Sequence, residues 1–87
     1  MAQDGWQRRI IEHRAVVTKV RGVVTEKGLE LQVGDMSLGD AILFVAQPPD
    51  GFDTSAAVLL YGNNETLNNS QCRRLWDAHG RALAVRD

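Results

Sequence analysis

The sequence predicts an α+β domain: a small antiparallel β-sheet or open barrel of four to five strands, with one C-terminal helix at about residues 69–79. The chain has 87 residues, a length that suits one domain. Residues 10–25 are rich in β-branched side chains, whereas the apolar spacing after residue 69 is helical. We therefore treat residues 1–87 as a single compact domain, with residues 1–8 as a candidate flexible arm.

The segment from Ile10 to Thr25 carries two competing patterns. Nine of its sixteen residues are β-branched, a composition typical of strands and unfavourable for helices. The other pattern has the four- and three-residue steps of one helical face and consists of Trp6, Ile10, His13, Val17 and Val20. We predict a strand, and a helix confined to residues 5–13 before the strand would satisfy both patterns.

Residues 26–33 predict a β-hairpin. Glu26-Lys27-Gly28 supplies a turn in which glycine tolerates positive φ, and residues 29–33 then alternate apolar and polar side chains. Val33-Gly34-Asp35 is expected to end the second strand, because Gly and Asp favour turn geometry.

Six consecutive apolar residues, Ala41–Ala46, come just before Pro48-Pro49. The length of this run suits a buried central strand. The alternative is a helix over residues 38–46, because Ser37 and Asp40 have the spacing of a capping box.

A loop at residues 48–51 follows, since prolines and Asp-Gly interrupt regular structure. Residues 55–61 are a second candidate for a buried strand, ended by Gly62-Asn63-Asn64. We expect the segments 41–47 and 55–61 to pair as a hairpin.

The last part of the chain contains the clearest helical pattern. Its apolar face is formed by Leu67, Cys72, Leu75, Trp76 and His79. Asn69 or Ser70 would cap the start of the helix, and Gly80 would end it. After Gly80 we favour a short closing strand at residues 81–86 over a helical continuation.

Charge is distributed unevenly along a chain whose net charge is only −1. Residues 1–28 hold six basic and three acidic side chains, residues 29–70 hold none and six, and residues 71–87 hold four and two. Either the basic ends cover the acidic middle within one molecule, or these surfaces face partners.

No catalytic or metal-binding pattern emerges from the sequence. Cys72 and His79 would lie about 10.5 Å apart along one helix, too far for a direct dyad. Cys72 is therefore expected in the core. It is the only cysteine, so it cannot form an intramolecular disulfide, and there is no zinc-ligand spacing or phosphate-binding loop. Asp50 and Asp53 fit turns better than a metal site. We expect no enzymatic activity, cofactor or metal.

The remaining interpretation is a small non-enzymatic protein-binding module, a regulator, inhibitor or assembly component that acts by surface docking on a protein or by self-association as a homodimer. The residues expected to bind the partner are Trp6, Arg8, Arg9, Arg73 and Arg74. The alternative is a nucleic-acid-binding accessory protein that uses the basic N-terminal segment, although the acidic half of the chain opposes it. No apolar run is long enough for a membrane span, and the N-terminus lacks a signal-peptide pattern, so a cytoplasmic location is expected.

Overall fold

The computed structural model describes residues 4–62 and 64–83, and it confirms the predicted α+β class. The elements of these residues are α1 (Asp4–Glu12), β1 (Val17–Thr25), β2 (Glu30–Ser37), α2 (Leu38–Ala46), β3 (Phe52–Asp53), β4 (Val58–Tyr61), β5 (Glu65–Asn68) and α3 (Asn69–Leu83). Residues 1–3 of the candidate arm lie outside the described residues, and residues 4–8 belong to α1.

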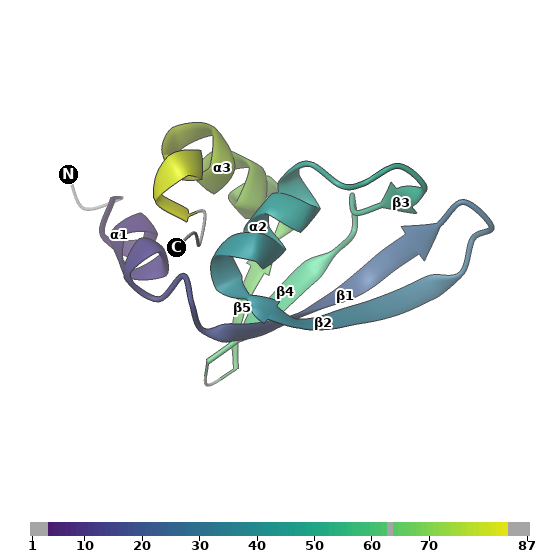
Figure 1. Ribbon diagram of the computed structural model, residues 1–87, viewed down its shortest axis with the longest axis horizontal. Coiled ribbons are helices and arrows are strands. Elements are labelled where there is room, and N and C mark those ends of the chain that lie inside the picture. Colours follow the sequence, from purple (N-terminus) through teal and green to yellow (C-terminus); the bar gives the residue numbers. More distant parts are fainter. Residues whose placement is uncertain (1–3, 63, 84–87) are drawn as a thin grey trace.

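The five strands form one open antiparallel sheet in the order β2-β1-β4-β5, with β3 paired to the far end of β1. The helices lie on one face of this sheet (Figure 1). The β1–β2 ribbon continues past the helices, and the molecule measures 42 Å along its longest axis. The fold is therefore two-layered at the helical end and a bare two-stranded ribbon, with β3 beside it, at the other end.

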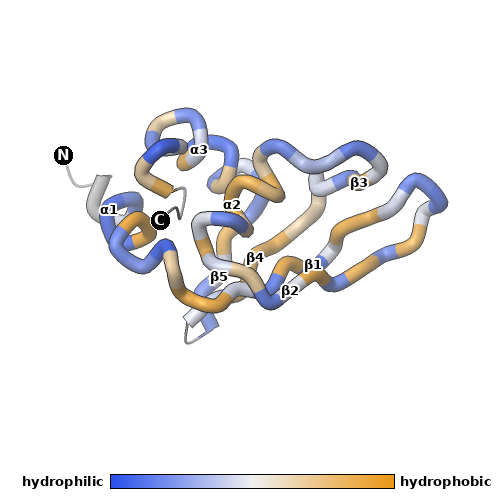
Figure 2. The backbone as a smooth tube through the Cα atoms, in the orientation of Figure 1, coloured by the Kyte–Doolittle hydropathy of each residue, from blue (hydrophilic) through white to orange (hydrophobic). Residues whose placement is uncertain are grey.

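The core lies between the sheet and the helices, where the hydrophobic stretches of both layers meet (Figure 2). Its fully buried large side chains include Val20, Val23, Leu38, Ile42, Leu59, Leu75 and Leu83. They come from β1, α2, β4 and α3, so each of these elements is held by apolar burial, at roughly 1.5–3 kcal/mol for each large side chain.

The helix considered for residues 5–13 is confirmed as α1, and the strand begins after it at Val17. Ile10 is buried in the core, which explains the helical spacing upstream of the β-branched segment. At the C-terminus of the helix the carbonyl oxygen of Ile11 accepts both Arg14 Nη1 (3.0 Å) and the Arg14 backbone N–H (3.3 Å).

The preferred prediction of a strand at residues 41–46 is wrong, and the helical alternative over residues 38–46 is right. Ser37 Oγ accepts the Asp40 N–H (3.1 Å), so the capping residue noted in the sequence does open α2. Because α2 lies between the sheet and α3, it is apolar around most of its circumference, and such a helix has the same uninterrupted apolar run as a central strand. The expected pairing with residues 55–61 does not form, since β4 pairs with β1 and β5.

β2 is longer than predicted. It continues to Ser37 instead of ending at residues 33–35, because its pairing with β1 passes an irregularity and resumes where Met36 meets Thr18. The turn-forming residues Gly34 and Asp35 thus produce a bulge within the strand.

The sequence analysis does not predict β3 or β5. β5 is polar apart from Leu67, its single buried residue, so it lacks a visible alternation of apolar side chains. Gly62 and Asn64 have φ angles of 56° and 68°, the left-handed conformation that a tight turn requires. The segment interpreted as the end of a strand is therefore the turn of a β4–β5 hairpin.

α3 is capped one residue earlier than predicted. Asn68 Oδ1 accepts the Gln71 N–H (2.8 Å), and Gln71 Oε1 accepts the Asn68 N–H (2.9 Å), which is a reciprocal capping box. Asn69 and Ser70, the predicted caps, are the first two residues of the helix.

The first helical part of α3 ends where the sequence predicts. The backbone leaves helical geometry at His79 (φ −137°, ψ 22°), next to Gly80, and a second helical segment then continues to Leu83. Gly80 also makes room for Trp76, whose ring would lie 3.2 Å from a β-carbon at that position. The closing strand expected at residues 81–86 is wrong for 81–83, and residues 84–86 lie outside the described part of the chain.

Candidate protein-binding groove

The structure places four of the five predicted partner-binding residues on two separate surfaces. Trp6 and Arg9 line a groove beside α1, which we call the α1 groove. Arg73 and Arg74 line a shallow depression along the exposed side of α3. Arg8 is exposed on α1 but is not among the residues that line the groove.

The α1 groove has a volume of about 570 Å³ and lies between α1 and the β4–β5 hairpin. One wall is formed by Trp6, Arg9, Ile10, His13 and Val16. The opposite wall is formed by Tyr61, Gly62, Glu65, Thr66, Leu67 and Gln71. The groove thus combines two aromatic side chains with a cation, an imidazole and a carboxylate, a mixture found in protein-recognition sites.

The position of α1 is fixed from both sides. Trp6 packs against the hydrophobic core, where Ile10 is only 5% exposed. On the neighbouring side of α1, His79 Nε2 donates a hydrogen bond to Oε1 of the buried Gln7 (2.9 Å), which ties α1 to the non-helical residue of α3. The wall of the groove therefore belongs to the folded core.

Charges within the groove act on Tyr61. Burial raises the pKa of its phenol most strongly, and the nearby Glu65 carboxylate raises it further. The Arg9 guanidinium lowers this pKa, so the Arg9 charge lies close enough to Tyr61 to be felt there. His13 is held by its Nδ1, which donates to the carbonyl oxygen of Arg9 (2.8 Å). Arg9 and His13 consequently present their polar groups at one edge of the groove.

The depression on α3 is a weaker candidate. It is lined by Asn69, Ser70, Arg73, Arg74, Asp77 and Ala78, so it has no large apolar side chain to anchor a partner. Asp77 lies three and four residues after the two arginines, on the same part of the helix, and offsets part of their charge. The structure does not bring Arg73 and Arg74 into the α1 groove.

The thiol of Cys72 is buried, and the carboxylate of Asp53 is held in a turn. Cys72 is fully buried, as expected, and burial raises the pKa of its thiol to about 12, so it stays protonated. Asp53 Oδ1 accepts the Ser55 N–H (2.9 Å), which is the turn geometry expected from the sequence and which lowers the Asp53 pKa. Within residues 4–62 and 64–83 there is no group of three or more metal-ligating side chains.

Tyr61 and Glu65 line the groove, but the sequence analysis does not identify them as binding residues. The sequence indicates only a buried strand at Tyr61 and no element at Glu65, because the β4–β5 hairpin has no clear signal in the sequence. The available signal was Gly62-Asn63-Asn64, a turn-forming sequence directly after an apolar strand.

Comparison of the chain with known protein families, characterised proteins and solved structures found no match. Among the described residues, no helix is both long and apolar enough to cross a membrane.

Proposed function

We propose that this chain is a small non-enzymatic protein-binding module, and that it docks a segment of another protein in the α1 groove. The observation that carries this proposal is the convergence of Trp6, Arg9 and Tyr61 on one groove from elements far apart in the sequence. Tryptophan, tyrosine and arginine are the side chains most enriched at the energetic centres of protein interfaces.

The groove favours a peptide segment with one large apolar side chain next to a carboxylate. The apolar side chain would pack between the Trp6 and Tyr61 rings, and the carboxylate would accept hydrogen bonds from Arg9. Glu65, on the opposite wall, would repel a second carboxylate, so the segment would enter in one orientation.

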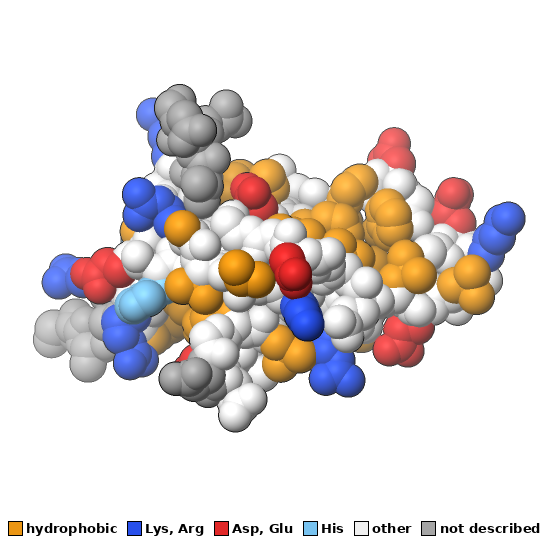
Figure 3. All heavy atoms as spheres, turned by 60° about the horizontal axis from the view of Figure 1, so that its bottom comes forward, with side chains coloured by type: hydrophobic (Ala, Val, Ile, Leu, Met, Phe, Trp, Pro, Cys, Tyr) orange, Lys and Arg blue, Asp and Glu red, His pale blue; other side chains and the backbone are white. Residues whose placement is uncertain are grey.

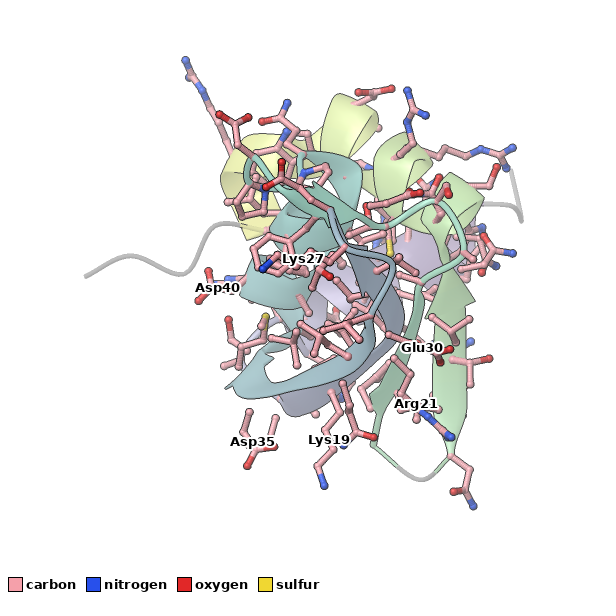
Figure 4. The ribbon with its side chains drawn as sticks, turned by 90° about the vertical axis from the view of Figure 1, so that its right-hand side faces the viewer. Lys19, Arg21, Lys27, Glu30, Asp35 and Asp40 are labelled. Atoms are coloured by element: carbon pink, nitrogen blue, oxygen red, sulfur yellow. The ribbon has the colours of Figure 1, made fainter. Side chains whose placement is uncertain are left out.

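Nucleic-acid binding is supported less well. Lys19 and Arg21 project from the sheet face away from the helices, where a phosphate backbone could approach (Figure 4). However, Glu30 and Asp53 both pair with Val24 further along β1, which places carboxylates beside the same strand. These acids would repel phosphates, and we treat nucleic-acid binding as an outcome of the test below.

The test uses a phage-displayed library of random peptides and two matched variants. Arg8→Glu and Arg9→Glu change the net charge equally on neighbouring residues, but only Arg9 lines the groove. We expect the protein to enrich peptides with an apolar residue beside Asp or Glu. For an enriched peptide, Arg9→Glu should weaken binding at least about tenfold, equivalent to ~1.4 kcal/mol, whereas Arg8→Glu should change it by less than about twofold.

Two results would contradict the proposal. One is the failure of the library to yield any peptide whose affinity distinguishes Arg9→Glu from Arg8→Glu. The other is binding of a fluorescent oligonucleotide at low salt with the steep salt dependence of phosphate contacts, because it would assign the basic residues to nucleic acid.

A further inference from the structure

The β1–β2 ribbon leaves one edge of the sheet open. β2 is the terminal strand of the sheet, and within the described residues it pairs with β1 alone. It spans eight residues and contains neither Lys nor Pro, the side chains with which proteins commonly protect an edge strand. An edge of this kind is a template for a further strand.

The hydrogen-bonding groups that point outward from β2 follow from the geometry of the turn. The Leu29 carbonyl accepts the Thr25 N–H (2.9 Å), so the backbone groups of Leu29 point toward β1. Leu31 lies two residues further along the chain and pairs with Val23, so its backbone groups also point toward β1. In an antiparallel ladder alternate residues turn their backbone groups the other way. The N–H and C=O groups of Glu30 and Gln32 therefore point away from the sheet.

The side chains of the same segment divide between the two faces of the sheet. Leu31 and Val33 pair with the buried Val23 and Val20, so they lie on the face that carries the helices, as does Leu29 by alternation. Leu29 remains 61% exposed and Leu31 38% exposed. Figure 3 shows apolar side chains gathered at the ribbon end of the molecule, with acidic side chains around them.

We propose that β2 pairs with β2 of a second copy of this chain, antiparallel about a two-fold axis at Leu31. In this register Glu30 of one chain lies opposite Gln32 of the other and the two exchange backbone hydrogen bonds, while Leu31 lies opposite Leu31. Leu29 lies opposite the partner's Val33, so the exposed apolar side chains of both copies cover one another.

Charge disfavours the neighbouring register that is centred on Glu30. Centring the pair on Glu30 would place two carboxylates directly opposite each other, which is destabilising. Centring it on Leu31 avoids that contact and brings the turn that carries Lys27 alongside the partner's Asp35. Lys27 is the only cation in residues 26–37, which form the turn and β2, so it is the cation that this edge offers to a carboxylate of the other copy.

Sedimentation equilibrium of the full chain tests the proposal. We expect a concentration-dependent dimer of twice 9.6 kDa. Leu31→Lys should give a monomer, because two ammonium groups would meet on the two-fold axis. The matched control is Val17→Lys, which places the same change on an apolar strand residue that is 64% exposed. Val17 pairs with Ser37 at the end of β2 away from Leu31, outside the residues that meet in the proposed register, so this variant should remain dimeric.

Two further variants examine the hydrogen bonds and the register. Gln32→Pro removes an outward N–H that β1 does not use, so it should abolish the dimer and leave the circular-dichroism spectrum of the fold unchanged. Leu31→Cys should form an intermolecular disulfide under mild oxidation, because residues facing each other at a non-hydrogen-bonded pair have Cα atoms about 4.5 Å apart, whereas Val33→Cys should not. Buried Cys72 should not react in the folded chain.

A wild-type chain that sediments as a monomer up to millimolar concentration would overturn the proposal. So would a dimer that Leu31→Lys and Gln32→Pro leave intact, because that dimer would use another surface. Efficient cross-linking of Val33→Cys without that of Leu31→Cys would overturn the register.

Discussion

Gly39→Ala is expected to destabilise the fold, although alanine is the better helix former. Gly39 lies in the first turn of α2, and a β-carbon there would collide with the carbonyl oxygen of Leu83 and lie 3.0 Å from its carbonyl carbon. Both atoms belong to the backbone of α3, so no side-chain rotation relieves the collision. The Gly39 N–H also donates to the carbonyl oxygen of Arg14 (2.8 Å), which restricts movement of α2 on its other side.

The change in the free energy of unfolding is the sum of two opposing contributions. Overpacking by one methyl group costs about 1–3 kcal/mol, and contact with a backbone belongs at the upper end, ~3 kcal/mol. Replacing glycine with alanine inside a helix returns about 1 kcal/mol. The expected net loss is therefore about 2 kcal/mol, which for a domain of this size lowers Tm by roughly 8–16 °C.

Thermal and urea unfolding followed by circular dichroism measure this effect. Gly28→Ala serves as a comparison, because no atom lies within 4 Å of a β-carbon there and its cost comes from φ (+81°) alone, about 1–2 kcal/mol. For Gly39→Ala, the direction of the change in Tm tests the reasoning. If residues 80–83 did not fold back as a second helical segment after His79, no Leu83 backbone would face Gly39, and the substitution would raise Tm through helix propensity. A higher Tm would refute the reasoning.

Three other predictions concern local interactions. Asn68→Ala removes the acceptor for the Gln71 N–H and should cost about 1 kcal/mol in unfolding free energy, measured with urea; no change would argue against the capping box. The raised pKa of Cys72 means that the native state holds its proton more tightly, so stability should fall between pH 9 and about 12 by up to ~1.4 kcal/mol per pH unit, and Cys72→Ala should flatten this decline. The lowered pKa of Asp53 means that its contribution to stability is present above the pKa of the unfolded state and is lost as pH falls through the folded pKa; NMR titration should place its midpoint below 3.8, and Asp53→Asn should abolish that part of the pH dependence.

The sequence identifies those parts of the fold whose signal is local. The Ser37 cap, the turn before Gly28 and the apolar face that includes Leu75 each depend on residues close together in the chain, and each appears in the structure. For residues 41–46 the local patterns conflict. The Ser37 cap indicates a helix, but the six apolar residues after Asp40 fit a central strand as well, because a helix enclosed by a sheet and by α3 is apolar around most of its circumference.

Only one wall of the α1 groove can be predicted from local sequence signals. Trp6 and Arg9 lie on a helix that the apolar spacing suggests, and the sequence analysis names both as partner-binding residues. The other wall depends on β5, which needs only Leu67 to be buried because it is an edge strand, and one apolar residue is too little to mark a strand in a sequence. The placement of Trp6 and Tyr61 along one groove is therefore a property of the tertiary structure alone.

The two proposed surfaces differ in charge and lie in different parts of the molecule. The α1 groove carries Arg9 and His13 at the helical end, while the open edge of β2 carries Glu30 and Asp35 on the ribbon, so the two surfaces share no residue. A dimer joined through β2 would leave both α1 grooves free. A partner with two matching segments would then engage the second groove at high effective concentration, and its avidity could exceed the affinity of one groove by roughly 10²–10⁴. Leu31→Lys should remove this avidity while leaving the affinity for a single peptide unchanged, which separates the two proposals experimentally.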